Sequence, residues 1–450
     1  MYPVYLHREV SDMGFSQLAT RDYRSIDKSI LSFQDLKSRI HRLLIERIDL
    51  SKLDLLRNGE LANEIGFVIE TLIGEEGVPL SRQEKERLVI EVQHETFGLG
   101  PIEPLLTSPD ISDILVNNYN STYVERNGKL EKTNVVFRDN NHLMQIIERI
   151  VTRVGRRIDE SSPYVDARLP DGSRVNAIIP PLAIDGPVLS IRRFGLEALK
   201  MNDMLVLGSL DERIATVIEG AVKTRLNILV CGGTGTGKTT LLNVISEFIP
   251  DDERIITIED SAELQLKQDH VVRLETRPAN IEGSGEVTQR DLVRNALRMR
   301  PNRIILGEVR GGEALDMLQA MNTGHDGSIS TIHANTVRDA MSRLATMVMM
   351  TGMDLPDRAI REQISSAINI IINLVRFADG TRKIVKIAEI TGMEGNTIVM
   401  QDIFCFEQRG IDQEGRILGE FKATGVRPHF AERFKMYGYD LPPGIFERGA

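Results

Sequence analysis

The chain has 450 residues, too many for one ordinary hydrophobic core, so we expect two or three domains. Apolar residues make up 41% of it and charged residues 27%, a balance typical of globular proteins and not of disordered ones. The net charge of −10 argues against a protein that wraps around nucleic acid, although it leaves room for a local basic channel.

The cysteines and the N-terminal segment indicate the compartment. Cys231 and Cys405 are far apart in sequence and cannot form a Cys-x-x-Cys metal pair, which favours a reducing cytoplasm. The first 14 residues lack the apolar core of a signal peptide. No apolar run approaches the ~18 residues needed to span a bilayer. We therefore expect a cytoplasmic protein that reaches a membrane only through a partner.

The first predicted elements are helices. Residues 1–27 show no sustained periodicity, and we expect a flexible or loosely docked tail there. From Ile30 onward, apolar residues recur at steps of three and four. Ser81 lies three residues before Glu84, which is the spacing of a capping box, so a helix should start at Ser81. These patterns predict a helical bundle over 28–97.

Short strands come next in the chain. A Gly- and Pro-rich stretch at 97–106 opens a new unit. Alternating segments at 113–118 and 122–131 predict strands, and Asn127-Gly128 within the second is a hairpin signal. With a helical run that follows, these segments predict an α+β domain over 98–194 and then a linker over 195–210.

Arginines are dense near the end of this α+β domain. Arg168 and Arg174 flank a glycine turn in DARLPDGSRVN, and Arg192 and Arg193 end a strand. An arginine that one subunit presents to the γ-phosphate of another makes hydrolysis depend on assembly. We expect that catalytic role for Arg168 and Arg174, and nucleotide contacts for Arg192 and Arg193. Ordinary surface charge is the alternative for any single one of them.

The remaining residues, 211–450, alternate between strand and helix. Thr288 and Thr336 each precede an aspartate by three residues, a spacing that marks helix starts. Apolar strands are predicted at 227–233, 254–260, 270–275, 302–308 and 328–334. Alternation of this kind predicts an α/β fold with a parallel sheet covered by helices, here followed by a tail of hairpin-like segments.

The segment CGGTGTGKTT at 231–240 matches the complete phosphate-loop pattern, between an apolar strand and a helix. Its glycines let backbone N–H groups face the phosphates, and the helix N-terminus adds partial positive charge. We expect Lys238 to bridge the β- and γ-phosphates of ATP and the Thr239 hydroxyl to ligate Mg²⁺. A chance glycine turn is the alternative. The expected nucleotide-binding residues are Gly233, Thr234, Gly235, Thr236, Gly237, Lys238, Thr239 and Thr240.

An acidic cluster follows the strand at 254–260. It contains Glu259, Asp260 and Glu263. Acids beside a phosphate site repel it unless a cation intervenes, so we expect this cluster to hold Mg²⁺ and its waters together with Thr239. Glu259 is also a candidate catalytic residue. Helix capping by these acids is the alternative.

Another strand-end acid comes from NRIILGEVRGG. This segment resembles a Walker B strand in which Gly307 replaces the usual aspartate. A carboxylate at the C-terminal end of a sheet strand lies beside the nucleotide site and can orient the attacking water. We assign that catalytic role to Glu308. A solvated strand-end acid is the alternative.

Two histidines bracket the next strand. His325 and His333 flank the polar, strand-like SISTI. A lone histidine is more often structural, but a pair in a nucleotide domain suggests sensing of the γ-phosphate or orientation of water. Zinc is not expected, because no third or fourth ligand is spaced nearby.

Together these features resemble the secretion ATPase superfamily, whose members drive type II secretion, type IV pili and type IV secretion. The hallmarks of that family are a Walker A loop, an Asp box, a Gly-Glu Walker B and a His box. They stand here in that order as GGTGTGKT, IITIEDSAEL, IILGEVRG and GHDGSISTIHAN. Segments such as GLGPIEPLL and DARLPDGSRVNAIIPP look closest to the CpaF/TadA-type motors of the tight-adherence (Tad, type IVc, Flp) pilus.

The resemblance implies a hexameric ring in which a PAS-like domain precedes a RecA-like ATPase domain, with ATP and Mg²⁺ between the two. Arginines of the DARLPDGSR segment would contact the nucleotide. The ring would act on an inner-membrane platform protein, at the cytoplasmic face, and so add or withdraw pilin subunits. Some relatives carry a tetracysteine zinc module, which two isolated cysteines exclude here.

The leading hypothesis is therefore a cytoplasmic ATPase motor for a Tad-type pilus. The alternative nearest to it is a type IV secretion ATPase that acts in protein or DNA export. A nucleic-acid translocase belongs to a different class, and the acidic net charge and the absence of Trp argue against a nucleic-acid partner. A nucleotide-gated scaffold that hydrolyses little is the last alternative.

Overall fold

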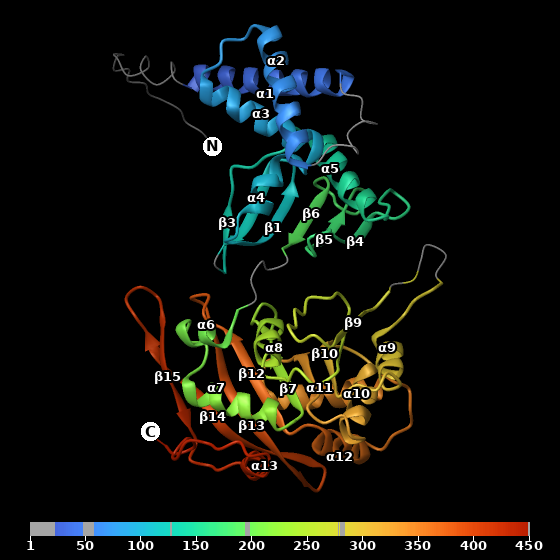
Figure 1. Ribbon diagram of the computed structural model, residues 1–450, viewed down its shortest axis with the longest axis vertical. Coiled ribbons are helices and arrows are strands. Elements are labelled where there is room, and N and C mark those ends of the chain that lie inside the picture. The colour runs from blue at the N-terminus through green and yellow to red at the C-terminus, as the bar shows by residue number, and fades with distance from the viewer. Residues whose placement is uncertain are drawn as a thin grey trace, which may run out of the picture. The chain divides into compact units, whose positions relative to one another are not determined.

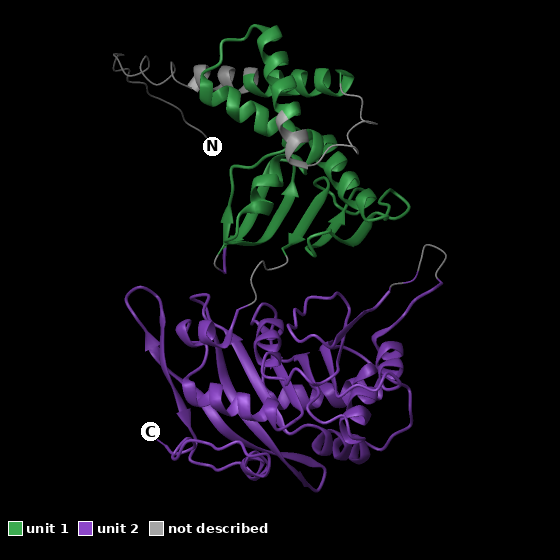
Figure 2. Ribbon diagram, in the orientation of Figure 1, with its two compact units in different colours: residues 1–126, 130–193 green, residues 127–129, 194–450 purple. Residues whose placement is uncertain are grey.

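The structure is a computed structural model that describes residues 23–47, 58–126, 128–193, 199–277, 279 and 284–448. The chain divides into two compact units (Figure 2). One unit comprises residues up to 126 together with 130–193, and the other comprises 127–129 and the residues from 194 onward. Among the described residues, no helix has both the length and the apolar character needed to cross a bilayer.

Three helices open the first unit (Figure 1): α1 (Tyr23–Arg47), α2 (Asn58–Glu76) and α3 (Arg82–Phe97). Each contributes buried aliphatic side chains to a shared core, which explains the three- and four-residue spacing of the sequence. Examples are Leu36, Ile40, Leu44, Ile65, Ile69, Leu72, Leu88 and Val92.

The starts of two of these helices test the sequence predictions. Ser81 caps α3 and forms a complete capping box with Glu84, as the spacing predicted. α1 begins at Tyr23, so residues 23–27, which the sequence placed in the tail, are helical in the structure. Extending a helix that is already nucleated costs little, even where the apolar pattern has faded. Residues 1–22 of the expected tail lie outside the described residues.

A mixed sheet-and-helix layer completes the first unit. Its strand order is β3-β2-β1-β6-β5-β4, and buried residues of α5 (Asn140–Arg153) pack with the sheet in one core. Gly128, between β2 and β3, has a φ of +79°, which suits the predicted hairpin turn, while Asn127 lies outside the described residues. The other bounds are η2 (Gly100–Ile102), α4 (Glu103–Thr107), β1 (Ile111–Asn118), β2 (Ser121–Arg126), β3 (Lys129–Lys132), β4 (Tyr164–Arg168), β5 (Arg174–Ile178) and β6 (Val188–Arg192).

The second unit is built on a larger sheet with the order β15-β14-β13-β12-β7-β11-β10-β8-β9. Its strands are parallel from β12 to β9, and β12 to β15 are joined antiparallel. The strand bounds are β7 (Ile228–Gly232), β8 (Ile255–Glu259), β9 (Val271–Glu275), β10 (Arg303–Val309), β11 (Ile329–His333), β12 (Ile370–Arg376), β13 (Arg382–Glu394), β14 (Thr397–Ile411) and β15 (Ile417–Ala423).

Helices cover both faces of this sheet. Alternate residues along a strand point to opposite faces, so they belong to two separate hydrophobic cores. Ile228 and Ile305 pack with α7 and α8 in one core, whereas Leu229 and Leu306 pack with α9 to α12 in the other. The helix bounds are α6 (Met201–Val206), α7 (Glu212–Lys223), α8 (Lys238–Ser246), α9 (Gln289–Ala296), α10 (Glu313–Asn322), α11 (Val337–Met349), α12 (Asp357–Ala367) and α13 (Phe430–Met436).

Two details of this unit bear on the sequence predictions. Thr288 and Thr336 cap α9 and α11 as expected. The predicted linker over 195–210 is wrong for its second half, because Met204 of α6 and Leu210 are buried in the core with Ile228. Apolar burial of this kind favours docking of the segment over a free connection. Residues 194–198 lie outside the described residues.

Candidate nucleotide-binding and hydrolysis site

The candidate site lies where parallel strands end. β7, β11, β10 and β8 are neighbours in the sheet, so their carboxyl ends share one edge. Gly232, His333, Glu308 and Glu259 are at or next to those ends, and α8 begins at the same edge. In open α/β sheets this edge is where ligands bind.

The phosphate loop connects β7 to α8. Gly235 and Gly237 have φ angles of +69° and +93°, a left-handed conformation that favours glycine. A Cβ atom at Gly232 would lie 2.5 Å from Oγ1 of Thr236, so that position also excludes a larger residue. Thr236 in turn donates to the backbone oxygen of Gly233 at 3.0 Å. The sequence folds into a tight loop whose turn ends at the N-terminus of α8.

Lys238 is the first residue of α8, and its ammonium group remains at the loop. Its Nζ donates to the backbone oxygens of Gly232 at 3.1 Å and Gly233 at 3.0 Å. Thr239 and Thr240 follow in the first turn of α8 and are half-buried, whereas Thr234 is exposed. The loop thus gathers a cation, hydroxyl groups and a helix N-terminus, which are the groups that a polyphosphate requires.

Glu259 ends β8 with a buried side chain, 3% exposed. Its Oε1 accepts hydrogen bonds from the backbone N–H groups of Glu263 at 2.8 Å and Leu264 at 3.0 Å. Its Oε2 is buried and has no hydrogen-bond partner in the structure. Burial raises the pKa of Glu259 to about 7, and the nearby charge of Glu263 adds to the rise. An unsatisfied buried carboxylate oxygen is suited to a cation or to water bound to one.

Gly307 and Glu259 are complementary in shape. β10 and β8 pair in parallel, with Leu306 opposite Ile258 one residue earlier. A Cβ atom at position 307 would lie 2.9 Å from Cγ of Glu259 and 3.5 Å from its Oε1. The carboxylate from β8 therefore occupies space that a side chain at 307 would need, which gives a physical reason for glycine at the usual aspartate position.

Glu308 is held by an arginine that the sequence reasoning missed. Nε and Nη2 of Arg310 donate to Oε2 of Glu308 at 3.0 and 2.6 Å. Nη1 of Arg310 donates to Oδ2 of Asp260 at 2.9 Å. Asp260, expected to help hold Mg²⁺, is thus ion-paired with Arg310 in this structure. Arg310 directly follows β10, and its position two residues after Glu308 in GEVRG is the signal that could have found it.

His333 belongs to the same edge as the loop. It pairs in register with Gly232 across β11 and β7. Its pKa is lowered by burial and by the charge of Lys238, and the charge of Glu308 acts in the opposite direction. These interactions show that the structure brings His333, Lys238 and Glu308 together.

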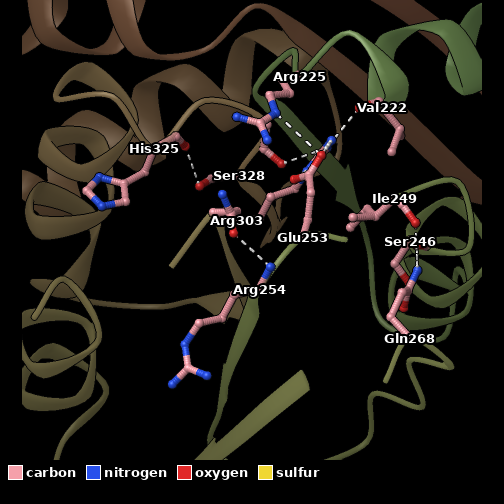
Figure 3. A network of polar contacts seen from close by, with 12 residues as sticks. Val222, Arg225, Ser246, Ile249, Glu253, Arg254, Gln268, Arg303, His325 and Ser328 are labelled. Carbon is pink, nitrogen blue, oxygen red and sulfur yellow. Dashed lines mark hydrogen bonds and ion pairs between the residues drawn. The ribbon is translucent and has the colours of Figure 1, made fainter. Parts of the chain in front are cut away.

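His325 lies at the amino ends of the parallel strands, and His333 lies at their carboxyl ends. The predicted pair of histidines therefore does not meet at one site in this chain. His325 precedes the amino end of β11, and its backbone oxygen accepts from Ser328 at 2.8 Å. Figure 3 shows it near Arg303, the first residue of β10, which forms a buried ion pair with Glu253 at 2.6 Å. His333 is the last residue of β11, and the four strand residues before it extend over roughly 13 Å between the two histidines.

The predicted arginines belong to the first unit. Arg168 pairs in register with Arg174, and Arg174 with Arg192, so the three lie side by side on β4, β5 and β6. Arg193 behaves differently, because its Nη1 donates to the backbone oxygen of Ile111 at 2.9 Å. That bond anchors the start of β1, and the nucleotide contact expected for Arg193 stays a prediction.

Two further side chains support the site and were not singled out from the sequence. Oε1 of Glu313, in α10, accepts from the backbone N–H groups of Arg310 at 2.6 Å and Gly311 at 2.7 Å. Oδ1 of Asn243, in α8, accepts from the N–H of Gln265 at 2.9 Å and so ties the acidic segment to the loop helix. The partners of Glu313 lie only two and three residues before it, so its signal is local, an acid in the first turn of a helix. Asn243 carries no such signal, because its partner is 22 residues away.

The arrangement does not form a metal cage from side chains alone. Within the described residues, no group of three or more His, Cys, Asp or Glu side chains is placed to hold a metal ion. Mg²⁺ commonly takes only one or two protein ligands and completes its shell with phosphate and water. The unsatisfied Oε2 of Glu259 and the hydroxyl of Thr239 are hard oxygen donors of the required kind.

Comparison with known proteins adds the family. Residues 95–420 match the model of the family described as "Type II/IV secretion system protein", and residues 33–95 match "Type II secretion system protein E, N-terminal domain". A putative conjugal transfer protein of Mycobacterium tuberculosis is 38% identical over 310 residues, which cover 68% of this chain and 88% of that protein. The type IV secretion system protein VirB11 of Brucella suis is 32% identical over 305 residues, which cover 62% of this chain and 84% of that protein.

Among solved structures, the VirB11 ATPase from the Brucella suis type IV secretion system, in complex with sulphate, is similar at 29% identity with a TM-score of 0.35. The match covers 67% of this chain and 98% of that chain. The family match extends over most of this chain, and the predicted α/β fold with a RecA-like ATPase domain is confirmed. The chain belongs to the type II/IV secretion system protein family, and it is an ATPase of that family.

Proposed function

We propose that this ATPase hydrolyses ATP at the carboxyl edge of the second unit's sheet and uses the energy to drive a secretion or pilus machine. The observation that carries the proposal is the convergence of Lys238, Glu259, Glu308 and His333 at the strand ends that adjoin the phosphate loop. A loop of this kind, a buried carboxylate and a strand-end carboxylate are the parts that phosphoryl transfer to water requires.

Each residue has a role in this proposal. Lys238 and the loop N–H groups bind the phosphates, and Thr239 with Glu259 holds Mg²⁺ directly or through water. The bound cation would neutralise charge that develops on the phosphates. Glu308, oriented by Arg310, accepts a proton from the attacking water and directs it. His333, whose pKa is lowered and which is therefore neutral at pH 7, is a candidate for contact with the γ-phosphate.

The machine that we favour is a Tad-type pilus. One support is the resemblance of segments such as DARLPDGSRVNAIIPP to that branch. The other is that two isolated cysteines exclude the tetracysteine zinc module that some relatives carry. In this proposal the chain forms a hexamer at the cytoplasmic face of the inner membrane and acts on a platform protein. Arg168, Arg174 and Arg192, which lie side by side, would reach the nucleotide from another domain or subunit.

A second candidate is a type IV secretion ATPase. It is favoured by the relatives, because they include a putative conjugal transfer protein and VirB11. Deletion of the gene separates the two candidates: loss of surface pili supports the first, and loss of transfer of protein or DNA with pili intact supports the second. Neighbouring genes give an independent test: genes for pilins and a prepilin peptidase support the first candidate, and a conjugation cluster supports the second.

The hydrolysis itself is tested with Glu308→Gln. We expect the purified wild-type chain to show Mg²⁺-dependent ATP hydrolysis, and the variant to lose at least about 100-fold in turnover. The variant should keep its nucleotide affinity and its oligomeric mass, because only the base is removed. Wild-type turnover in Glu308→Gln would overturn the role of Glu308.

A further inference from the structure

Asn243 and Thr239 lie on the same face of α8. They are one helical turn apart, a spacing at which side chains are neighbours. Thr239 supplies the hydroxyl that is proposed to hold Mg²⁺. Oδ1 of Asn243 accepts a hydrogen bond from the backbone N–H of Gln265 at 2.9 Å. The helix face that carries Thr239 therefore also binds the segment that follows β8.

The same segment holds Glu259. The N–H groups of Glu263 and Leu264 donate to Oε1 of Glu259 at 2.8 and 3.0 Å. The next N–H along the chain, that of Gln265, donates to Asn243. Leu264 is buried in one core with aliphatic side chains of α8. A shift of Gln265 away from α8 would therefore disturb the bonds that fix Oε1 of Glu259, and with them the direction of Oε2.

The far end of the segment is anchored separately. Nε2 of the buried Gln268 donates to the backbone oxygens of Ser246 at 2.7 Å and Ile249 at 3.1 Å, at and beyond the last residue of α8 (Figure 3). These bonds lie further along the chain than the N–H groups that bind Glu259. The bond to Asn243 directly follows those groups, so it is the tie to α8 that adjoins the acid.

We propose that Asn243 is a positioning residue for Mg²⁺: it fixes the segment that orients Glu259 to the helix that carries Thr239. This inference rests on the proposed function, because it takes Glu259 and Thr239 as the residues that hold the cation. Oε2 of Glu259 is buried and has no hydrogen-bond partner among the described residues, so its direction decides whether it can meet a cation. Removal of a group that orients a metal ligand commonly costs about tenfold or more in metal affinity.

The test measures ADP binding to the full-length chain by calorimetric titration, once with Mg²⁺ and once with EDTA. We expect Mg²⁺ to tighten ADP binding by the wild type, and Asn243→Ala to reduce that gain about tenfold. The affinity in EDTA should stay within about twofold of the wild type, because the phosphate loop is unchanged. Alanine suits a helix interior, and thermal melts check that the variant is folded. Asn243→Asp keeps an acceptor oxygen and should recover most of the gain.

A double variant separates positioning from general support of the fold. Glu259→Gln should itself lower the gain from Mg²⁺. If Asn243 acts through Glu259, adding Asn243→Ala should lower the gain no further, because the effects of coupled residues are not additive. An additive loss would overturn the positioning role.

Asn302→Ala is the matched control. Oδ1 of Asn302 likewise accepts a backbone N–H, that of Arg254 at 2.8 Å, but the bond lies at the amino ends of β10 and β8. This variant loses a bond of the same kind away from the phosphate loop. It should therefore keep the full gain from Mg²⁺.

Two results would separate the failures. A wild-type gain from Mg²⁺ in Asn243→Ala, while Glu259→Gln has lost it, would overturn this inference and leave the proposed function in place. A full gain in Glu259→Gln, or no ADP binding by the wild type, would overturn the proposed function itself.

Discussion

Arg310 donates two hydrogen bonds to one oxygen of Glu308, from Nη2 at 2.6 Å and from Nε at 3.0 Å. The same guanidinium group reaches Asp260 with its remaining nitrogen at 2.9 Å. One side chain thus joins the carboxyl ends of β10 and β8. Glu308 is the proposed base. Its orientation depends on Arg310, which is not expected to contact the nucleotide in this arrangement.

Replacing Arg310 should separate chemistry from binding. In Arg310→Ala, we expect turnover to fall about tenfold to 100-fold, because the carboxylate of Glu308 loses its fixed orientation. ADP affinity should stay within about twofold of the wild type. Steady-state kinetics and titration with ADP measure the two quantities. Arg361→Ala is the control, since Arg361 pairs with Asp357 on α12, and a wild-type turnover in Arg310→Ala would contradict the positioning role.

The close approach of Gly307 to Glu259 gives another prediction. Gly307→Ala should lower turnover and cost about 1–3 kcal/mol of stability, because the new methyl group displaces a buried carboxylate. Adding Glu259→Ala removes the Cγ atom that the new methyl group would meet, so Gly307→Ala should cost less stability in that background. Chemical denaturation measures both effects. Gly410→Ala is the control, since a Cβ atom there meets nothing within 4 Å, and equal stability of Gly307→Ala and wild type would contradict the proposed crowding.

The raised pKa of Glu259 predicts a pH dependence. The folded state holds the proton up to about pH 7, against an ordinary value of 4.5, chiefly because burial disfavours the charged carboxylate. A carboxyl group whose pKa is higher in the folded state than in the unfolded state stabilises the fold below the unfolded pKa, and that stabilisation is lost as the pH rises towards 7. The loss of unfolding free energy is at most about 3 kcal/mol, since one pH unit corresponds to about 1.4 kcal/mol.

The measurement compares wild type with Glu259→Gln, in denaturant and without Mg²⁺. Between pH 5 and 8 the wild type should lose stability relative to the variant, because glutamine cannot ionise. The comparison cancels groups that titrate equally in both proteins. A difference in unfolding free energy that stays constant over this range would show that Glu259 is ionised throughout.

The sequence by itself determined features that act over a few residues. The glycines between Gly232 and Thr239 define a tight loop, because its left-handed positions favour glycine. Ser81, Thr288 and Thr336 mark helix starts, because a capping side chain bonds to the backbone of its own first turn. Strand and helix alternation likewise indicated the parallel sheet. These signals are local, so no knowledge of distant partners was needed.

The tertiary structure alone decided which distant residues meet. Glycine at 307 is explained only by the side chain of Glu259, and the bond from Gln265 to Asn243 joins the segment after β8 to the helix after β7. His325 was separated from His333 because a strand has two ends and only one adjoins the loop. Strand order and register arise from packing across the whole sheet, which no short stretch of sequence encodes.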